Sequence, residues 1–88
     1  MKLDLKMPAD QAVLVERLIP LLERQHVDSL TVFPYRRPGE PQYWLAFLHV
    51  AGARHAIGTP DLRHLRLEEQ LEDLLRQLRA FSVDVLPV

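Results

Sequence analysis

Histidines are the residues of this chain best suited to metal binding or acid–base catalysis, and four occur, at His26, His49, His55 and His64. Protein metal sites usually combine histidines at short, regular spacings with cysteine or carboxylate ligands. None of the four stands in such a motif, and the chain contains no cysteine. The sequence therefore predicts no metal site, and we interpret the histidines as surface or partner-facing residues.

The sequence also lacks the motifs of covalent catalysis and phosphate binding. A serine nucleophile needs a neighbouring base, and a phosphate-binding loop needs clustered glycines. The candidate serines, Ser29 and Ser82, each begin a predicted strand without such a base, and the three glycines are isolated. We predict no catalytic residue and no cofactor; nothing argues for an enzyme, and the question stays open.

Arginines offer a different chemistry, because a guanidinium group can hold a phosphate or carboxylate. Arg36 and Arg37 are adjacent at the tip of a predicted hairpin, and Arg54 follows the second arm of that hairpin. The three form a candidate anion-binding cluster. The alternative is that they belong to a solvated turn.

Length and charge limit the architecture and the partners. Eighty-eight residues are expected to form one domain, spanning 1–88. The net charge of −1 lacks the basic excess that phosphate backbones select, so nucleic acid is not the expected partner. No apolar run approaches the ~20 residues of a membrane span. No signal-peptide pattern opens the chain, so we expect a cytoplasmic protein.

Two helices are predicted from apolar residues at helical spacing. The first covers roughly 9–26, and Pro20 predicts a bend or break in it between Glu16 and Leu21, because proline lacks an N–H and crowds the preceding turn. The second follows a start signal at Thr59, with a first turn that is separate or bent. Its apolar stripe consists of Leu67, Leu71, Leu74, Leu75, Leu78 and Phe81.

Four strands are predicted from alternating, β-branched or aromatic residues. Residues 51–58 are left open: pairing either stops at Ala51-Gly52 or resumes and ends at Gly58. The predicted strands are residues 2–7, 29–36, 42–50 and 82–85.

The resulting order, β-α-β-β-α-β, resembles the split β-α-β pattern of ferredoxin-like domains. The resemblance implies an α+β fold in which two helices cover one face of a four-stranded antiparallel sheet. That fold hosts many unrelated activities, so it implies no function.

The clearest functional pattern lies on the face of the hairpin that would point away from the helices. A turn over 36–42 sets Tyr35 opposite Tyr43 and Phe33 opposite Leu45, and alternation then gathers apolar side chains on the outer face. An apolar patch of this kind usually marks an interface. The interface residues predicted are Phe33, Tyr35, Tyr43, Leu45, Phe47 and His49, flanked on the same face by polar Lys2, Asp4, Lys6, Ser82 and Asp84.

These patterns predict a non-catalytic domain that self-associates or binds a partner protein through the open sheet face. Two structural alternatives remain: the register is wrong, or residues 51–58 fold over the patch. A different function is a small-molecule or substrate pocket between the sheets of a dimer. RNA binding is a third, because residues 43–48 are similar to the aromatic strand of RNA-recognition modules, although they lack its basic residue and glycine.

Overall fold

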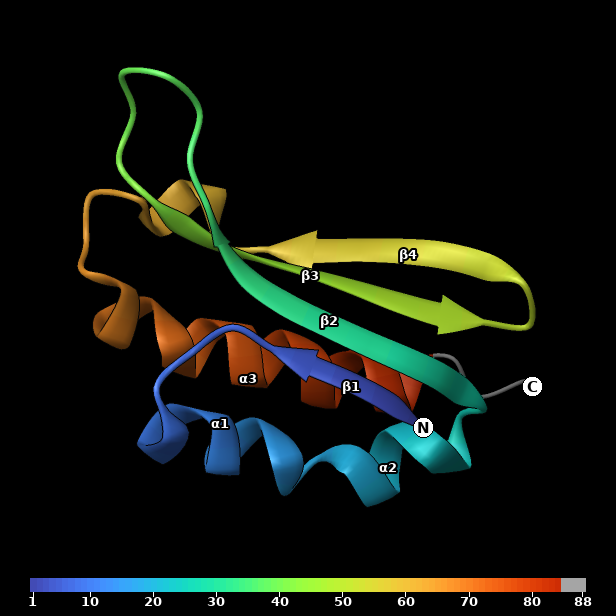
Figure 1. Cartoon of the computed structure of the whole chain (residues 1–88). Helices are drawn as coiled ribbons and strands as arrows, with labels where there is room; N and C mark the ends of the chain where they lie inside the picture. The colour runs from blue at the N-terminus through green and yellow to red at the C-terminus, as the bar shows by residue number, and fades with distance from the viewer. Residues whose placement is uncertain (85–88) are drawn as a thin grey trace.

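The computed structural model describes the backbone of residues 1–84 and the side chains of residues 1–81. Within this part of the chain, strands and helices follow one another as shown in Figure 1. In chain order they are β1 (Lys2–Leu5), α1 (Ala9–Glu16), α2 (Ile19–Arg24), β2 (Val27–Tyr35), β3 (Tyr43–Val50), β4 (Ala53–Gly58), the 3₁₀ helix η1 (Pro60–Leu62) and α3 (Leu67–Asp84).

All four strands belong to one sheet with the order β1-β2-β3-β4. β1 runs parallel to β2, whereas β2, β3 and β4 form an antiparallel meander. The helices α1 and α2 make the crossover that a parallel pair requires. In Figure 1 the three α-helices lie on the same side of the sheet, so the other sheet face is uncovered by the described part of the chain.

The chain is α+β with a four-stranded sheet, as predicted, but the ferredoxin-like arrangement is wrong in two respects. The fourth strand comes from residues 53–58, and residues 82–84 continue α3 instead of forming a strand. The predicted last residue of that strand, Val85, lies outside the described residues. The sheet is also mixed, because β1 pairs in parallel with β2. Alternation over only four residues is too short to distinguish a strand from the last turn of a helix.

The break predicted near Pro20 is confirmed. α1 ends at Glu16 and α2 begins at Ile19. Between them the Leu18 N–H donates to the Val15 carbonyl at 2.9 Å, which makes a tighter, 3₁₀-like turn. Pro20 then occupies the first turn of α2, where its missing N–H disturbs no helical hydrogen bond.

The core lies between the sheet and the helices, and the predicted stripe of α3 supplies its centre. Leu74 and Leu78 are fully buried, and Leu71 and Leu75 are nearly so. These side chains meet one face of the sheet and the inner sides of α1 and α2. The other buried core residues are Val15, Leu18, Leu22, Val27, Leu30, Val32, Trp44, Ala46 and Leu48.

A set of buried hydrogen bonds ties the start of α3 to the strands. The backbone N–H of Trp44 donates to Thr59 Oγ1 at 2.9 Å, and the Thr59 hydroxyl donates to Gln70 Oε1 at 2.6 Å. Gln70 Nε2 in turn donates to the carbonyls of Gln42 at 3.0 Å and Leu65 at 2.8 Å. Because both polar side chains are almost fully buried and hydrogen-bonded, they fix the position of α3 against the sheet.

Candidate interaction face

The uncovered sheet surface, called here the open face, carries the residues that the sequence pattern placed there. Phe33 lies opposite Leu45 and Tyr35 opposite Tyr43, which confirms the predicted register. Of the intervening residues, Val32, Trp44 and Ala46 are buried in the core and Pro34 is half-buried, as alternation requires. By the same register the open face includes Lys2, Asp4, Ser29, Thr31, Phe33, Tyr35, Tyr43, Leu45, Phe47, His49, Arg54, Ala56 and Gly58.

Four aromatic rings on this face form a continuous row along β2 and β3. The ring centroids of Tyr43 and Tyr35 are 5.5 Å apart, those of Tyr35 and Phe33 6.5 Å, and those of Phe33 and Phe47 5.8 Å. The Arg54 guanidinium carbon lies 4.6 Å from the centroid of Phe47 and ends the row with a cation–π contact. We call these four aromatic residues the aromatic row.

Exposure varies along the open face. The middle of the patch is half-buried, because neighbouring rings cover part of one another. Tyr43 is only 8% exposed, whereas His49, at the other end, is exposed. The half-buried residues of the patch are Phe33, Tyr35, Leu45 and Phe47.

The segment that the sequence left open, residues 51–58, completes the sheet. It turns at Ala51 and Gly52, which both have positive φ angles, 51° and 80°. It then returns as β4 beside β3, with Ala56 opposite Phe47. The alternative in which this segment folds over the patch is therefore wrong.

The β1 side of the open face is polar. Lys2 lies beside Ser29 and Asp4 beside Thr31, and the Lys6 ammonium is 3.6 Å from the Asp4 carboxylate. The predicted contributions of Ser82 and Asp84 to this border are wrong, because both residues belong to α3. The apolar area is consequently concentrated on the two central strands.

The structure does not bring the three candidate anion-binding arginines together. Arg36 and Arg37 are exposed just beyond the end of β2, next to the Tyr35–Tyr43 pair. Arg54 pairs with His49 at the opposite end of β3, six residues away, or ~20 Å at a rise of ~3.3 Å per residue. Any anion bound by the adjacent pair is therefore bound without Arg54.

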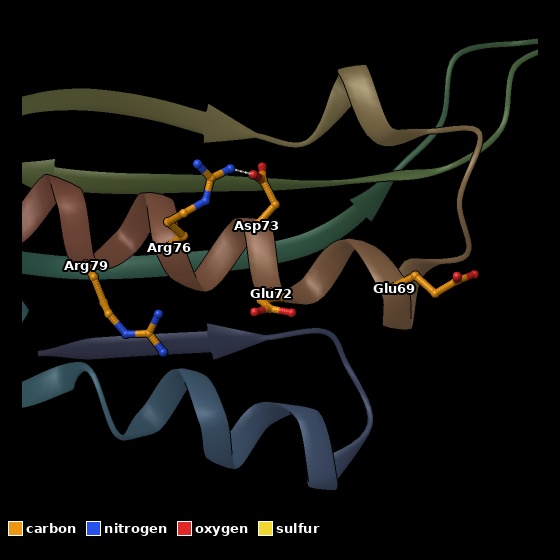
Figure 2. Close-up of a pocket in the computed structure, with 5 residues that line it drawn as sticks. All are labelled: Glu69, Glu72, Asp73, Arg76 and Arg79. Carbon is orange, nitrogen blue, oxygen red and sulfur yellow. Dashed lines mark ion pairs between the residues drawn. The ribbon is translucent and has the colours of Figure 1, made fainter.

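A second surface feature is a shallow hollow on α3 lined by charged residues. Figure 2 shows their side chains spread along the helix instead of converging on one point. Arg76 forms an ion pair with Asp73, three residues earlier on the helix. The residues lining the hollow are Glu69, Glu72, Asp73, Arg76 and Arg79.

Ion pairs engage several of the charged residues on this surface of α3. Arg66 Nε donates to Glu69 Oε1 at 3.0 Å, and the Arg66 backbone N–H donates to the same oxygen at 3.3 Å. These bonds lower the pKa of Glu69, and the bond to Glu69 together with nearby Glu68 raises the pKa of Arg66. Across the described side chains, no group of three or more histidine, aspartate or glutamate residues is placed to hold a metal ion.

Similarity to known proteins adds no further assignment, because the chain matches no family model and no curated protein significantly. No helix within the described residues is long and apolar enough to span a membrane. The open face is thus the surface whose composition calls for a functional explanation.

Proposed function

We propose that this chain is a non-catalytic interaction module that associates with a second copy of itself through the open face. The observation that carries the proposal is the aromatic row, which is continuous and bordered by polar residues, and in which Phe33, Tyr35 and Phe47 are only half-buried. An exposed apolar patch with a polar rim is typical of an interaction site on a small domain.

A second copy is the favoured occupant because its own open face has the matching size and chemistry. β2 has nine residues and β3 eight. β1 adds four residues and β4 six. At ~4.8 Å between strands and a rise of ~3.3 Å per residue, the four strands present a face of roughly 430 Å². Two such faces bury ~860 Å² in total, which is the size of a weak interface, so we expect dimerisation no tighter than micromolar.

Charge also favours this occupant over nucleic acid. The open face and its border carry Lys2, Lys6 and Arg54 against Asp4, and these charges lie at the two edges of the sheet. The centre of the face is uncharged, which suits burial against another apolar surface. A single-stranded nucleic acid would need cations along its whole path and would bind with strong salt dependence.

The test is the solution mass of the full chain with Phe47→Glu, which places a carboxylate in the middle of the patch. The matched control is Val13→Glu, which adds the same charge at a 41%-exposed apolar residue on α1, away from the open face. We expect Phe47→Glu to weaken association at least tenfold and Val13→Glu to leave it unchanged. Sedimentation measures the mass, and circular dichroism checks that both variants fold.

Three outcomes would contradict the proposal. They are a monomeric wild-type chain at micromolar concentration, equal effects of the two glutamates, and a folded Phe47→Glu variant with undiminished association. If Phe47→Glu does not fold, Phe33→Glu on β2 serves as the second variant, since Phe33 belongs to the same row. A dimer that encloses a cavity between its sheets would instead support the small-molecule alternative.

A further inference from the structure

β4 is an edge strand with an exposed surface. It is the last strand in the sheet order, and its first four residues, Ala53 to Ala56, are all exposed. An exposed edge presents unpaired N–H and C=O groups and is a template for a further strand.

The hydrogen-bond pattern of the β3–β4 ladder identifies which groups face outward. The Thr59 N–H donates to the Trp44 carbonyl at 3.0 Å, so Thr59 and Trp44 are a hydrogen-bonded pair between the two arms of the hairpin. In an antiparallel ladder such pairs alternate with non-bonded pairs, whose backbone groups point away from the partner strand. The N–H and C=O groups of Arg54, Ala56 and Gly58 therefore point to the edge. The Gly58 carbonyl accepts a hydrogen bond at 2.6 Å from Gln77 of α3, as this orientation requires.

An apolar groove runs beneath this edge, between β4 and α3. Its lining combines Ile57 of β4 with Gln77, Ala80 and Phe81 of α3. The His55 ring packs edge-on against the Phe81 ring, with centroids 5.5 Å apart. Inward-pointing side chains of an added strand would enter this groove, while its backbone bonds to β4.

We infer that β4 pairs antiparallel with β4 of a second copy, with the two-fold axis at Ala56. In this register Ala56 faces its own equivalent, Arg54 faces Gly58 of the second copy, and His55 faces Ile57. The three outward-pointing residues of each strand then exchange about six backbone hydrogen bonds. Two of these are accepted by the Gly58 carbonyls, which already accept from Gln77 and use their second lone pair. The result is a continuous eight-stranded sheet.

The edge fits a second copy because this register is self-complementary. The bulky Arg54 side chain meets a glycine, not another arginine, so like charges are not opposed. On the helix side, Ile57 of each copy lies beside His55 and the adjacent Phe81 of the other. The two apolar grooves thus meet beneath the new strand pair and cover each other.

This inference goes beyond the proposed function, because it uses the edge of the sheet and leaves the open face available. The two contacts together would assemble four chains: two edge-paired dimers stacked through their open faces. Separate substitutions can remove the edge contact and the open-face contact, so an experiment can refute either proposal without refuting the other.

The test compares solution masses of the full chain by light scattering at micromolar concentration. Ala56→Pro removes an N–H that points away from β3, so the variant should keep its own sheet and lose edge pairing. The matched control, Ala56→Val, adds comparable bulk to the open face but keeps the N–H. We expect four times the 10.2 kDa chain mass for wild type and Ala56→Val, and twice that mass for Ala56→Pro.

Combining Ala56→Pro with Phe47→Glu separates the edge contact from the open-face contact. Phe47→Glu alone should have twice the chain mass, because the β4 edges still pair. The double variant Phe47→Glu/Ala56→Pro should be monomeric. A Phe47→Glu monomer would overturn the edge pairing while supporting the open-face proposal. A wild-type dimer lost in Ala56→Pro but kept in Phe47→Glu would support the edge pairing and overturn the open-face proposal.

A second variant keeps the test valid if Ala56→Pro fails to fold. Ala80 is exposed on α3 in the groove, and glutamate is compatible with a helix there. Ala80→Glu brings carboxylates from both copies to the seam and should halve the mass like Ala56→Pro. An unchanged mass in a folded Ala56→Pro or Ala80→Glu variant would overturn the edge pairing.

Discussion

Replacing Gln70 by leucine tests whether the buried hydrogen bonds at the start of α3 hold the fold together. Gln70 is 0% exposed and satisfies the hydroxyl of Thr59 and the carbonyls of Gln42 and Leu65. Leucine has a similar volume and fills the site without a large cavity, so the effect comes mainly from three polar groups left without their partner.

The magnitude follows from the burial of those groups. A buried polar group without a partner costs ~1–3 kcal/mol, and the cost is lower where water can reach it. The Thr59 hydroxyl is buried, whereas the two carbonyl bonds are only partly buried. We therefore expect Gln70→Leu to lower the free energy of unfolding by ~3–5 kcal/mol, a large part of the ~5–10 kcal/mol of a small domain.

The assay is urea unfolding followed by the fluorescence of Trp44, the single tryptophan, and by circular dichroism. All variants are compared at one protein concentration, because association contributes to apparent stability. Thr59→Val is the partner substitution, and the double variant should cost less than the sum of the single changes by ~1–2 kcal/mol. A Gln70→Leu variant within 1 kcal/mol of wild type, or strictly additive effects, would refute the reasoning.

Two further predictions concern the turn between β3 and β4 and the start of α3. Ala51 has a positive φ of 51° in a two-residue hairpin turn, where asparagine is favoured. Ala51→Asn should therefore raise the free energy of unfolding by ~0.5–1 kcal/mol, measured from thermal melts. Unchanged or lower stability would contradict this. The pKa of Glu69 is lowered in the folded chain by its bonds from Arg66, so its contribution is present above the unfolded pKa and is lost as the pH falls through the folded pKa. The stability difference between wild type and Glu69→Gln should therefore shrink on acidification, and a difference independent of pH would contradict the pairing.

Local patterns predicted the hairpin and the first helix because their causes are local. The register between β2 and β3 follows from alternation and the length of the turn, and Phe33, Tyr35 and Phe47 consequently lie on the predicted face. The break before Pro20 follows from the missing N–H of proline. Both features are set by short segments of the chain: the turn that joins two neighbouring strands, and the residues around one proline.

The strand order could not be predicted in the same way. Whether β1 lies beside β2 is decided by contacts between distant segments, which periodicity does not encode. Residues 53–58 and the predicted strand at the end of the chain both alternate weakly, yet residues 53–58 form β4 whereas residues 82–84 continue α3. The Thr59–Gln70 bond was likewise beyond sequence reasoning, because nothing in the spacing of the two residues shows that both become buried.

The architecture itself explains why the open face is the place to look for function. A two-layer α+β domain covers one face of its sheet and leaves the other to solvent, so polar residues are the simplest solution there. β1 places the polar residues Lys2 and Asp4 on this face, whereas β2 and β3 place a row of aromatic rings there. Those rings are not part of the core cluster, which lies on the other face and contains Trp44 and the leucines of α3. A surface that is apolar only on the strands farthest from the sheet edges is what an interface centred on the sheet would require.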